Sequence, residues 1–307
     1  MSFIILANCL ICFLLNLLNL TGTVRCNRLF LSVLAIFSFF LFNVAFISKD
    51  GVKEKMTWIP ISSNVHFLEW NIPVKSILSD SKLTVIRFKS DGVKASLCMA
   101  SEKKMVSKRL PEWLNDNGFH LVFNAGMYNL DNPIVSRGQM QSVSHVNNSV
   151  FNVEYRGIVA MDPFNTNDPS LLLADLNCTD LKAIKSRYGT FFQSLRMIDC
   201  KGQSISWNKR KQSCSMLLIA KDKIGNVYLF FARSPYTHNE MSSFLKLFSA
   251  DLSTAIYLEG GPETGIMLKY NSIHIERIGS YVSDVYATDT NTRFWKLPNV
   301  IGLNFLD

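Results

Sequence analysis

Charged residues are almost absent from the first 48 residues of the chain, which contain no acid and only two bases, Arg25 and Arg28. Two apolar runs, residues 3–20 and 29–47, fill most of this segment. Each run is long enough for a membrane helix, since about 20 apolar residues span the hydrocarbon core. The lack of charge argues against a solvated surface and predicts a membrane segment or a targeting signal.

Three interpretations of this leader stay open. The two runs form a helical hairpin, or the first lies in the membrane interface and the second is a signal anchor, or translation starts near Val24 and residues 31–45 are the core of a signal peptide. No small-x-small cleavage site follows the second run, which favours an uncleaved anchor.

We therefore expect a hydrophobic leader or membrane anchor over residues 1–48, a juxtamembrane linker over 49–61 and a single domain over 62–307. The domain is expected outside the cytoplasm, in a periplasm, on a cell surface or in a secretory lumen. It would be membrane-anchored or secreted, with the membrane as a partner through the N-terminal segment.

Paired metal-ligand spacings are also missing. The five histidines and seven cysteines fit no zinc pattern, so no metal site is predicted. Four cysteines lie beyond the leader: Cys98, Cys178, Cys200 and Cys214. Cys200 and Cys214 are the favoured disulfide pair because the residues between them could form a hairpin, with buried thiols as an equal alternative.

Motifs for nucleotide binding and for serine catalysis are absent as well. GGPETG (260–265) lacks the lysine and adjoining hydroxyl of a phosphate-binding loop, and a strand-like run follows it where a helix would be needed. The chain has no G-x-S-x-G turn. Beyond the leader, 30 bases face 24 acids, and the excess is thinly spread without interleaved aromatic residues. We predict no cofactor and no nucleic-acid partner.

Beyond the leader the hydrophobic pattern is mostly that of β-strands. Apolar and β-branched runs predict strands at 65–72, 83–88, 120–123, 157–161, 170–173, 191–198, 214–220, 227–232, 255–258 and 265–270. Helical spacing predicts helices over 102–115 and 239–252. The expected fold class is α+β, a mostly β-sheet single domain with a few packed helices, preceded by the N-terminal hydrophobic helix or helices.

Two of these strands end in polar residues. VFNAGMYN (122–129) stops at Asn124, and YLEGGPETG (257–265) reaches Glu259 before two glycines. Polar groups at the ends of buried strands are held rigidly and are open to a ligand. The alternatives are that Asn124 caps a turn and that the glycines form a plain hairpin.

The order of several motifs resembles the phosphodiester glycosidase family. FNAGMY (123–128) is followed by PIVSRGQ (133–139), FFQSLRMID (191–199), a strand pair over 211–234 and IYLEGGPETGIML (256–268). The resemblance covers about residues 62–305. The family includes the uncovering enzyme, which removes N-acetylglucosamine from a sugar phosphodiester, and uncharacterised bacterial envelope proteins.

The resemblance implies roles for particular residues of this chain. Glu259 stands where the family usually has aspartate, and Lys211, beside Arg210, stands where it commonly has arginine. Glu259 would activate water or stabilise the positively charged sugar carbon, with Glu263 as a second carboxylate. The implied catalytic residues are Glu259, Asn124 and Lys211, and the implied substrate-binding residues are Gly126, Tyr128, Arg137, Gln193, Ser194, Arg210, Gly260, Gly261 and Glu263, with Arg196 as a further candidate for the phosphate.

The resemblance therefore implies an exported or membrane-anchored hydrolase that cleaves the bond between a sugar C1 and a phosphate oxygen, in a glycan or glycosyl phosphate. The alternative is a glycan-binding envelope protein of the same fold without catalysis, which the changes at Glu259 and Lys211 motivate. A purely structural membrane-tethered domain is a third possibility.

Overall fold

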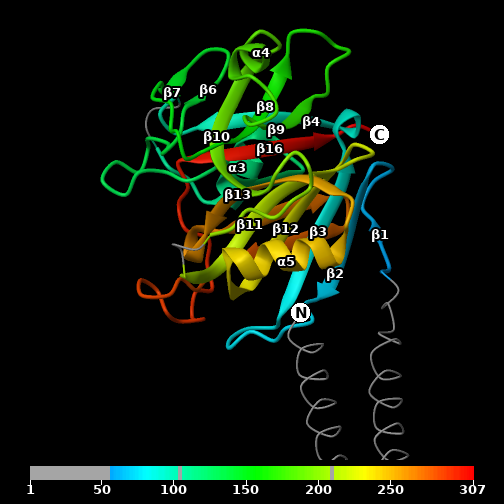
Figure 1. The fold of residues 1–307 in the computed structure, drawn as a ribbon, viewed down its shortest axis with the longest axis vertical. Coiled ribbons are helices and arrows are strands. Elements are labelled where there is room, and N and C mark those ends of the chain that lie inside the picture. Colours follow the sequence, from blue (N-terminus) through cyan, green and yellow to red (C-terminus); the bar gives the residue numbers. More distant parts are fainter. Residues whose placement is uncertain (1–55, 103–105, 208–210) are drawn as a thin grey trace, which may run out of the picture. The chain divides into compact units, whose positions relative to one another are not determined.

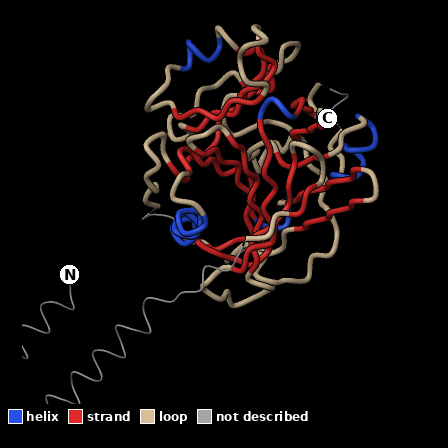
Figure 2. Tube along the Cα trace, turned by 90° about the vertical axis from the view of Figure 1, so that its right-hand side faces the viewer, coloured by secondary structure: helices blue, strands red, loops and turns tan. Residues whose placement is uncertain are grey.

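The computed structural model describes residues 56–102, 106–207 and 211–307, and residues 56–307 form one compact unit made mostly of strands. The predicted leader, most of the predicted linker and Arg210 lie outside the described residues. Among the described residues, no helix is both long and apolar enough to cross a membrane. Figure 2 shows strands through most of this unit, with short helices around them.

The larger of two antiparallel sheets carries most of the predicted strands (Figure 1). Its central strands follow one another in the order β3, β12, β11, β13 and β10, so strands distant in sequence lie side by side. The full path is β1 (Ile59–Pro60), β2 (Val65–Asn71), β3 (Lys82–Lys89), β12 (Asn226–Thr237), β11 (Ser213–Asp222), β13 (Leu252–Gly260), β10 (Tyr188–Ile198), β6 (Met140–Gln141) and β7 (Val146–Asn148), with β8 (Gly157–Pro163) paired to β10 and β9 (Leu171–Asp175).

The smaller sheet has five strands in the order β15 (Ile273–Ile278), β14 (Gly265–Tyr270), β5 (Leu121–Asn124), β16 (Asn299–Phe305) and β4 (Val93–Met99). One apolar cluster joins the two sheets, because Phe123 and Ile301 of the smaller sheet pack in it with Leu217 and Ile256 of the larger. Inward-facing residues of two sheets forming one core is the usual way a sandwich is stabilised. The ends of β5 and β13 therefore belong to different layers of the same core.

Three helices accompany the sheets: α3 (Leu110–Asn117), α4 (Leu181–Lys185) and α5 (His238–Phe248). α5 packs on the larger sheet through Met241, Phe244 and Leu245. Helix α3 begins at Leu110, later than predicted, because Pro111 fits only the first turn of a helix. Helix α5 ends before its predicted limit of residue 252, because β13 begins at Leu252. Two short 3₁₀ turns, η1 (Ser90–Gly92) and η2 (Gly261–Glu263), complete the elements.

The mostly β, single-domain prediction is confirmed for the described residues, but some strands were missed. β16 was not predicted, and it pairs with both β4 and β5, far earlier in the chain. β16 forms a strand because its backbone pairs with these two distant strands. β1 lies within the predicted linker and pairs with β2, so ordered structure begins before residue 62.

The disulfide prediction is wrong, because Cys200 pairs with Cys178. Cys214 lies inside β11, between β12 and β13, where it is buried with its Sγ 4.0 Å from the Tyr257 hydroxyl. Part of the segment between Cys200 and Cys214, for which a hairpin was expected, lies outside the described residues. The observed bond ties the segment after β9 to the end of β10.

Candidate functional site

Glu259 lies near the end of β13, where a β-bulge interrupts the pairing with β11. Glu259 faces Leu217, but the next residue of β11, Leu218, faces Tyr257, so β13 has one residue without a counterpart. Bulges redirect side chains and are common beside active sites. The bulge sets the direction of the Glu259 carboxyl independently of the regular alternation of the strand.

A second carboxyl, Glu263, lies close to Glu259 at the end of turn η2. Burial raises the pKa of Glu259 well above its usual range, and the negative charge of Glu263 raises it further. The hydrogen bond from the Gly260 N–H to Glu259 Oε1, at 3.1 Å, acts in the opposite direction. Burial also raises the pKa of Glu263. Because both carboxyls are buried and their charges repel each other, the pair keeps a proton to a higher pH than an isolated glutamate would.

Tyr128 completes the acidic cluster from the loop after β5. Burial raises the pKa of its phenol, and the charges of Glu263 and Glu259 add to the rise. Its hydroxyl stays protonated and hydrogen-bonds with the Glu263 carboxylate, which partly offsets the rise in the pKa of Glu263. Tyr128, Glu259 and Glu263, all implied by the resemblance, are thus brought together.

Arg137 supplies positive charge to this cluster. It is exposed, and its guanidinium lowers the pKa of Glu259 against the effect of burial. Its backbone N–H donates to the Met127 carbonyl at 3.0 Å, which fixes the Arg137 loop beside the chain leading to Tyr128. Of the candidate phosphate partners that the structure describes, Arg137 is the one whose charge acts on Glu259.

Asn124 holds the turn that carries Glu263. Its Nδ2 donates to the Glu263 carbonyl at 3.0 Å, and its Oδ1 accepts from the Gly265 N–H at 2.9 Å. The side chain is only 2% exposed. Both ends of the amide are occupied by backbone, so Asn124 positions Glu263, as the turn-capping alternative anticipated.

Gln193 and Ser194 also bind backbone. The Gln193 Oε1 accepts from the N–H groups of Gln139 and Asn152, each at 2.9 Å, and its Nε2 donates to the Asn152 and Tyr155 carbonyls. The Ser194 hydroxyl donates to the Tyr257 carbonyl. A ligand would have to displace these bonds inside the core. These side chains therefore hold the loops around the site together.

Gly126, Gly260 and Gly261, which the resemblance implies in substrate binding, lie where other protein atoms pack closely against the backbone. A Cβ on Gly260 would lie 2.1 Å from the Tyr257 hydroxyl, and one on Gly126 would lie 3.1 Å from the Phe192 ring. Gly126 and Gly261 both have φ of +76°, which favours glycine. Their contacts show a role in backbone geometry and packing, and their part in substrate binding stays a prediction.

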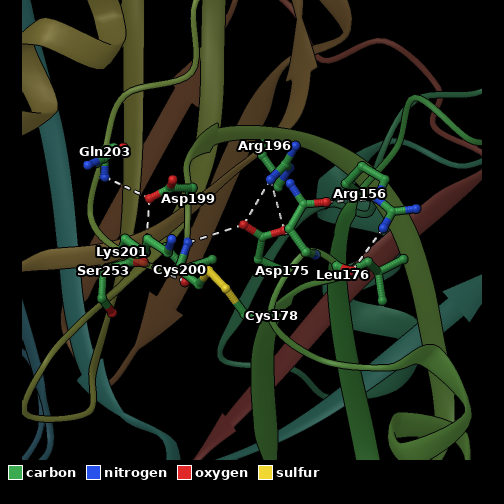
Figure 3. The surroundings of a disulfide bond; sticks show 12 residues. Arg156, Asp175, Leu176, Cys178, Arg196, Asp199, Cys200, Lys201, Gln203 and Ser253 are labelled. Carbon is green, nitrogen blue, oxygen red and sulfur yellow. Dashed lines mark hydrogen bonds and ion pairs between the residues drawn. A yellow bond between two sulfur atoms is a disulfide. The ribbon is translucent and has the colours of Figure 1, made fainter.

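Arg196 is paired with an acid outside the acidic cluster, and Lys211 is exposed just before β11. Two hydrogen bonds of 2.9 Å join Arg196 Nη1 to the two carboxylate oxygens of Asp175, next to the Cys178–Cys200 disulfide (Figure 3). This pairing corrects the prediction that Arg196 binds phosphate. No hydrogen bond or ion pair links Lys211 to Glu259 within the described residues.

Two residues that support turn η2, Asn291 and Gly279, could not be identified from the sequence. Asn291 is buried and its Nδ2 donates to the carbonyls of Gly279, at 2.7 Å, and Pro262, at 3.4 Å. The Gly279 N–H donates to the Thr264 carbonyl at 2.7 Å. Neither residue belongs to a motif, because a lone asparagine and a lone glycine in a polar loop carry no distinctive signal.

Replacing Glu259 with glutamine is expected to stabilise the protein at neutral pH. A raised pKa means that folding favours the protonated acid, so this stabilisation is present below the ordinary pKa of about 4.3 and is lost as pH rises through the folded-state value. Glutamine keeps the neutral form at every pH. The melting temperature of the variant should exceed that of the wild type at pH 7, by about 2 °C or more for each kcal/mol gained, with little difference near pH 4.

The matched control is Glu276→Gln, because Glu276 is exposed on β15. Thermal melts of both variants and the wild type at the two pH values provide the measurement. A melting temperature for Glu259→Gln that is raised equally at both pH values would contradict the electrostatic explanation.

Comparison with known proteins gives a relationship of fold. No family model and no curated protein matches the chain. A hypothetical protein from Synechocystis matches with a TM-score of 0.57 and 11% identity over 82% of this chain and 64% of the other, so the chain spans less than two thirds of that protein's length.

A second solved structure is the zebrafish N-acetylglucosamine-1-phosphodiester alpha-N-acetylglucosaminidase catalytic domain, auto-inhibited by its pro-peptide. It matches with a TM-score of 0.51 and 12% identity over 82% of this chain and 88% of the other. At these identities the comparison establishes architecture and not activity. The described domain is thus distantly related in fold to a phosphodiester glycosidase.

Proposed function

We propose that the protein is a glycosidase that hydrolyses the bond between a sugar C1 and the oxygen of a phosphodiester. The observation that carries the proposal is the cluster of Glu259, Glu263 and Tyr128, with Arg137 beside it, at the end of strand β13. The fold relationship to the zebrafish enzyme supports the choice of reaction. The apolar leader supports a domain held at a membrane outside the cytoplasm.

A proton retained by the two glutamates suits an anionic substrate. A carboxylate beside a phosphate would repel it, whereas a neutral carboxyl can donate a hydrogen bond, as buried acids with raised pKa values do in other enzymes. We assign that proton to Glu259, because burial and the charge of Glu263 both raise its pKa and Arg137 acts on it. Glu259 is thus suited to face the phosphate, together with the positive charge of Arg137.

The reaction assigns one step to each carboxyl. Water attacks the sugar C1, and its proton passes to the Glu263 carboxylate. The bond from C1 to the phosphate oxygen breaks, its electron pair stays on that oxygen, and the Glu259 proton is donated to it. A phosphate ester is a weakly basic leaving group, so charge stabilisation by Arg137 contributes alongside proton transfer.

The test uses the purified full chain with the methyl ester of N-acetylglucosamine-1-phosphate in water labelled with heavy oxygen. We expect free sugar and methyl phosphate, with the label in the sugar, measured by mass spectrometry and phosphorus NMR. Label in the phosphate would show cleavage at phosphorus and contradict the proposed reaction. Saturable sugar binding without turnover would instead support the non-catalytic alternative.

A further inference from the structure

Exposed apolar side chains occur on the loops that carry part of the candidate site. Four side chains on the segment between β5 and β8 define an apolar rim: Leu130, Val150, Phe151 and Val153, which are 83%, 69%, 37% and 73% exposed. Single exposed apolar residues are ordinary on a protein surface. Here, three of the four occur within four consecutive positions, and the segment that carries all of them also carries Arg137.

Hydrogen bonds fix the rim to the site. Asn152, between Phe151 and Val153, donates from Nδ2 to the Arg137 carbonyl at 3.1 Å. Its backbone N–H donates to Gln193 Oε1 at 2.9 Å, and this bond anchors the segment to β10. These bonds fix the backbone of the segment that carries Phe151 and Val153 to the backbone of Arg137 and to β10.

Leu130 belongs to the loop that carries both Tyr128 and Arg137. It lies two residues after Tyr128, and the N–H of the intervening Asn129 donates to the Val135 carbonyl at 2.8 Å. The chain then returns to Arg137, whose N–H bonds to Met127. In Figure 1 this segment includes β6 and β7. An anion held by Arg137 would thus have apolar side chains on the loops around it.

We propose that the phosphate of the substrate carries a hydrocarbon chain, which lies against the apolar rim. This inference rests on the proposed function and names its substrate class: an amphiphilic sugar-1-phosphodiester, with the sugar facing the glutamates and the phosphate at Arg137. In such a diester the second ester group leaves the phosphate on the side away from the sugar. A polar second group would gain no binding free energy from the apolar rim. An alkyl or isoprenoid chain would cover the rim and remove its apolar side chains from water.

The test compares the octyl and methyl esters of N-acetylglucosamine-1-phosphate, both below any micelle concentration, with the purified full chain. The octyl ester should have a kcat/KM about tenfold or more above that of the methyl ester, because each buried methylene favours binding. In the combined variant Leu130→Ser, Phe151→Ser and Val153→Ser the ratio should fall toward one. The control Ile224→Ser, an 84% exposed residue in the hairpin between β11 and β12, should keep the wild-type ratio.

The possible outcomes distinguish a failure of this inference from a failure of the proposed glycosidase activity. Equal kcat/KM for the two esters in the wild type would overturn the inference and leave the glycosidase proposal standing. If neither ester is hydrolysed, the proposed function fails, and calorimetric binding of the two esters still decides whether the rim selects hydrocarbon. If the rim variant still prefers the octyl ester, the hydrocarbon of the substrate binds at another surface, and the inference fails. Binding to phosphatidylcholine vesicles that is weakened in the rim variant, without any octyl preference in the wild type, would assign the rim to a lipid surface and overturn the inference.

Discussion

Replacing Glu259 with glutamine is expected to lower kcat for sugar-1-phosphodiester hydrolysis by about 10² to 10⁴-fold, the range for losing a general acid or base. Glutamine preserves the shape of the side chain and can still accept the Gly260 N–H at its oxygen. It cannot donate a proton to the departing phosphate. Steady-state kinetics at neutral pH measure the effect, and KM should change much less than kcat because the side-chain volume is unchanged.

The companion variant is Glu263→Gln, which removes the proposed proton acceptor for water. The two glutamates interact through charge, so we expect the double variant to lose far less than the product of the single losses. Glu276→Gln again serves as the control, since Glu276 lies on β15. Wild-type kcat in Glu259→Gln would remove Glu259 from the mechanism.

Replacing Gly279 with alanine is expected to destabilise the fold by about 3 kcal/mol or more, the upper part of the range for overpacking. The added Cβ would lie 2.3 Å from the Gly261 carbonyl oxygen, 2.8 Å from the Thr264 Cβ and 2.9 Å from the Thr264 carbonyl oxygen. Two of these contacts are with backbone, which cannot rotate away as a side chain can. The affected turn, η2, carries Glu263, so catalytic activity should fall together with stability.

Thermal melting should show a loss of about 6 °C or more for Gly279→Ala, at roughly 2 °C or more for each kcal/mol in a domain of this size. Gly118→Ala is the control, because Gly118 has φ of +65° but no atom within 4 Å of its Cβ position. The free energy of unfolding of that variant should fall only by the backbone strain, about 1 to 2 kcal/mol, and its activity should be retained. Equal melting temperatures for Gly279→Ala and the wild type would show that turn η2 is not held by this packing.

The acidic cluster could be predicted because its members lie in short motifs. Glu259 and Glu263 occupy one turn after a buried strand, and Tyr128 and Arg137 follow another strand within 14 residues of Asn124. Strand ends are recognisable from hydrophobic runs that stop at polar or glycine residues. The fold relationship to the zebrafish domain agrees with the resemblance at the level of architecture.

The roles of amide and basic side chains could not be predicted in this way. Asn124, Gln193 and Arg196 have groups that can bind a sugar or a phosphate, but each is paired inside the protein: with turn η2, with the loops around Gln139 and Asn152, and with Asp175. A polar side chain is available to a ligand only if the fold leaves its hydrogen bonds unfilled. That condition depends on residues far away in sequence.

The sequence by itself determined the mostly β character of the domain, the positions of its main strands and the short motifs that contain both glutamates, because these depend on local hydrophobic periodicity and on strand-end residues. The tertiary structure decided the pairing of Cys178 with Cys200, the insertion of β16 between β4 and β5, and the bulge at Glu259. It also decided that Arg137, and not Arg196, lies beside the carboxyls. The physical reason is that each of these features depends on contacts between distant segments, and burial and charge at a site arise only when those segments meet.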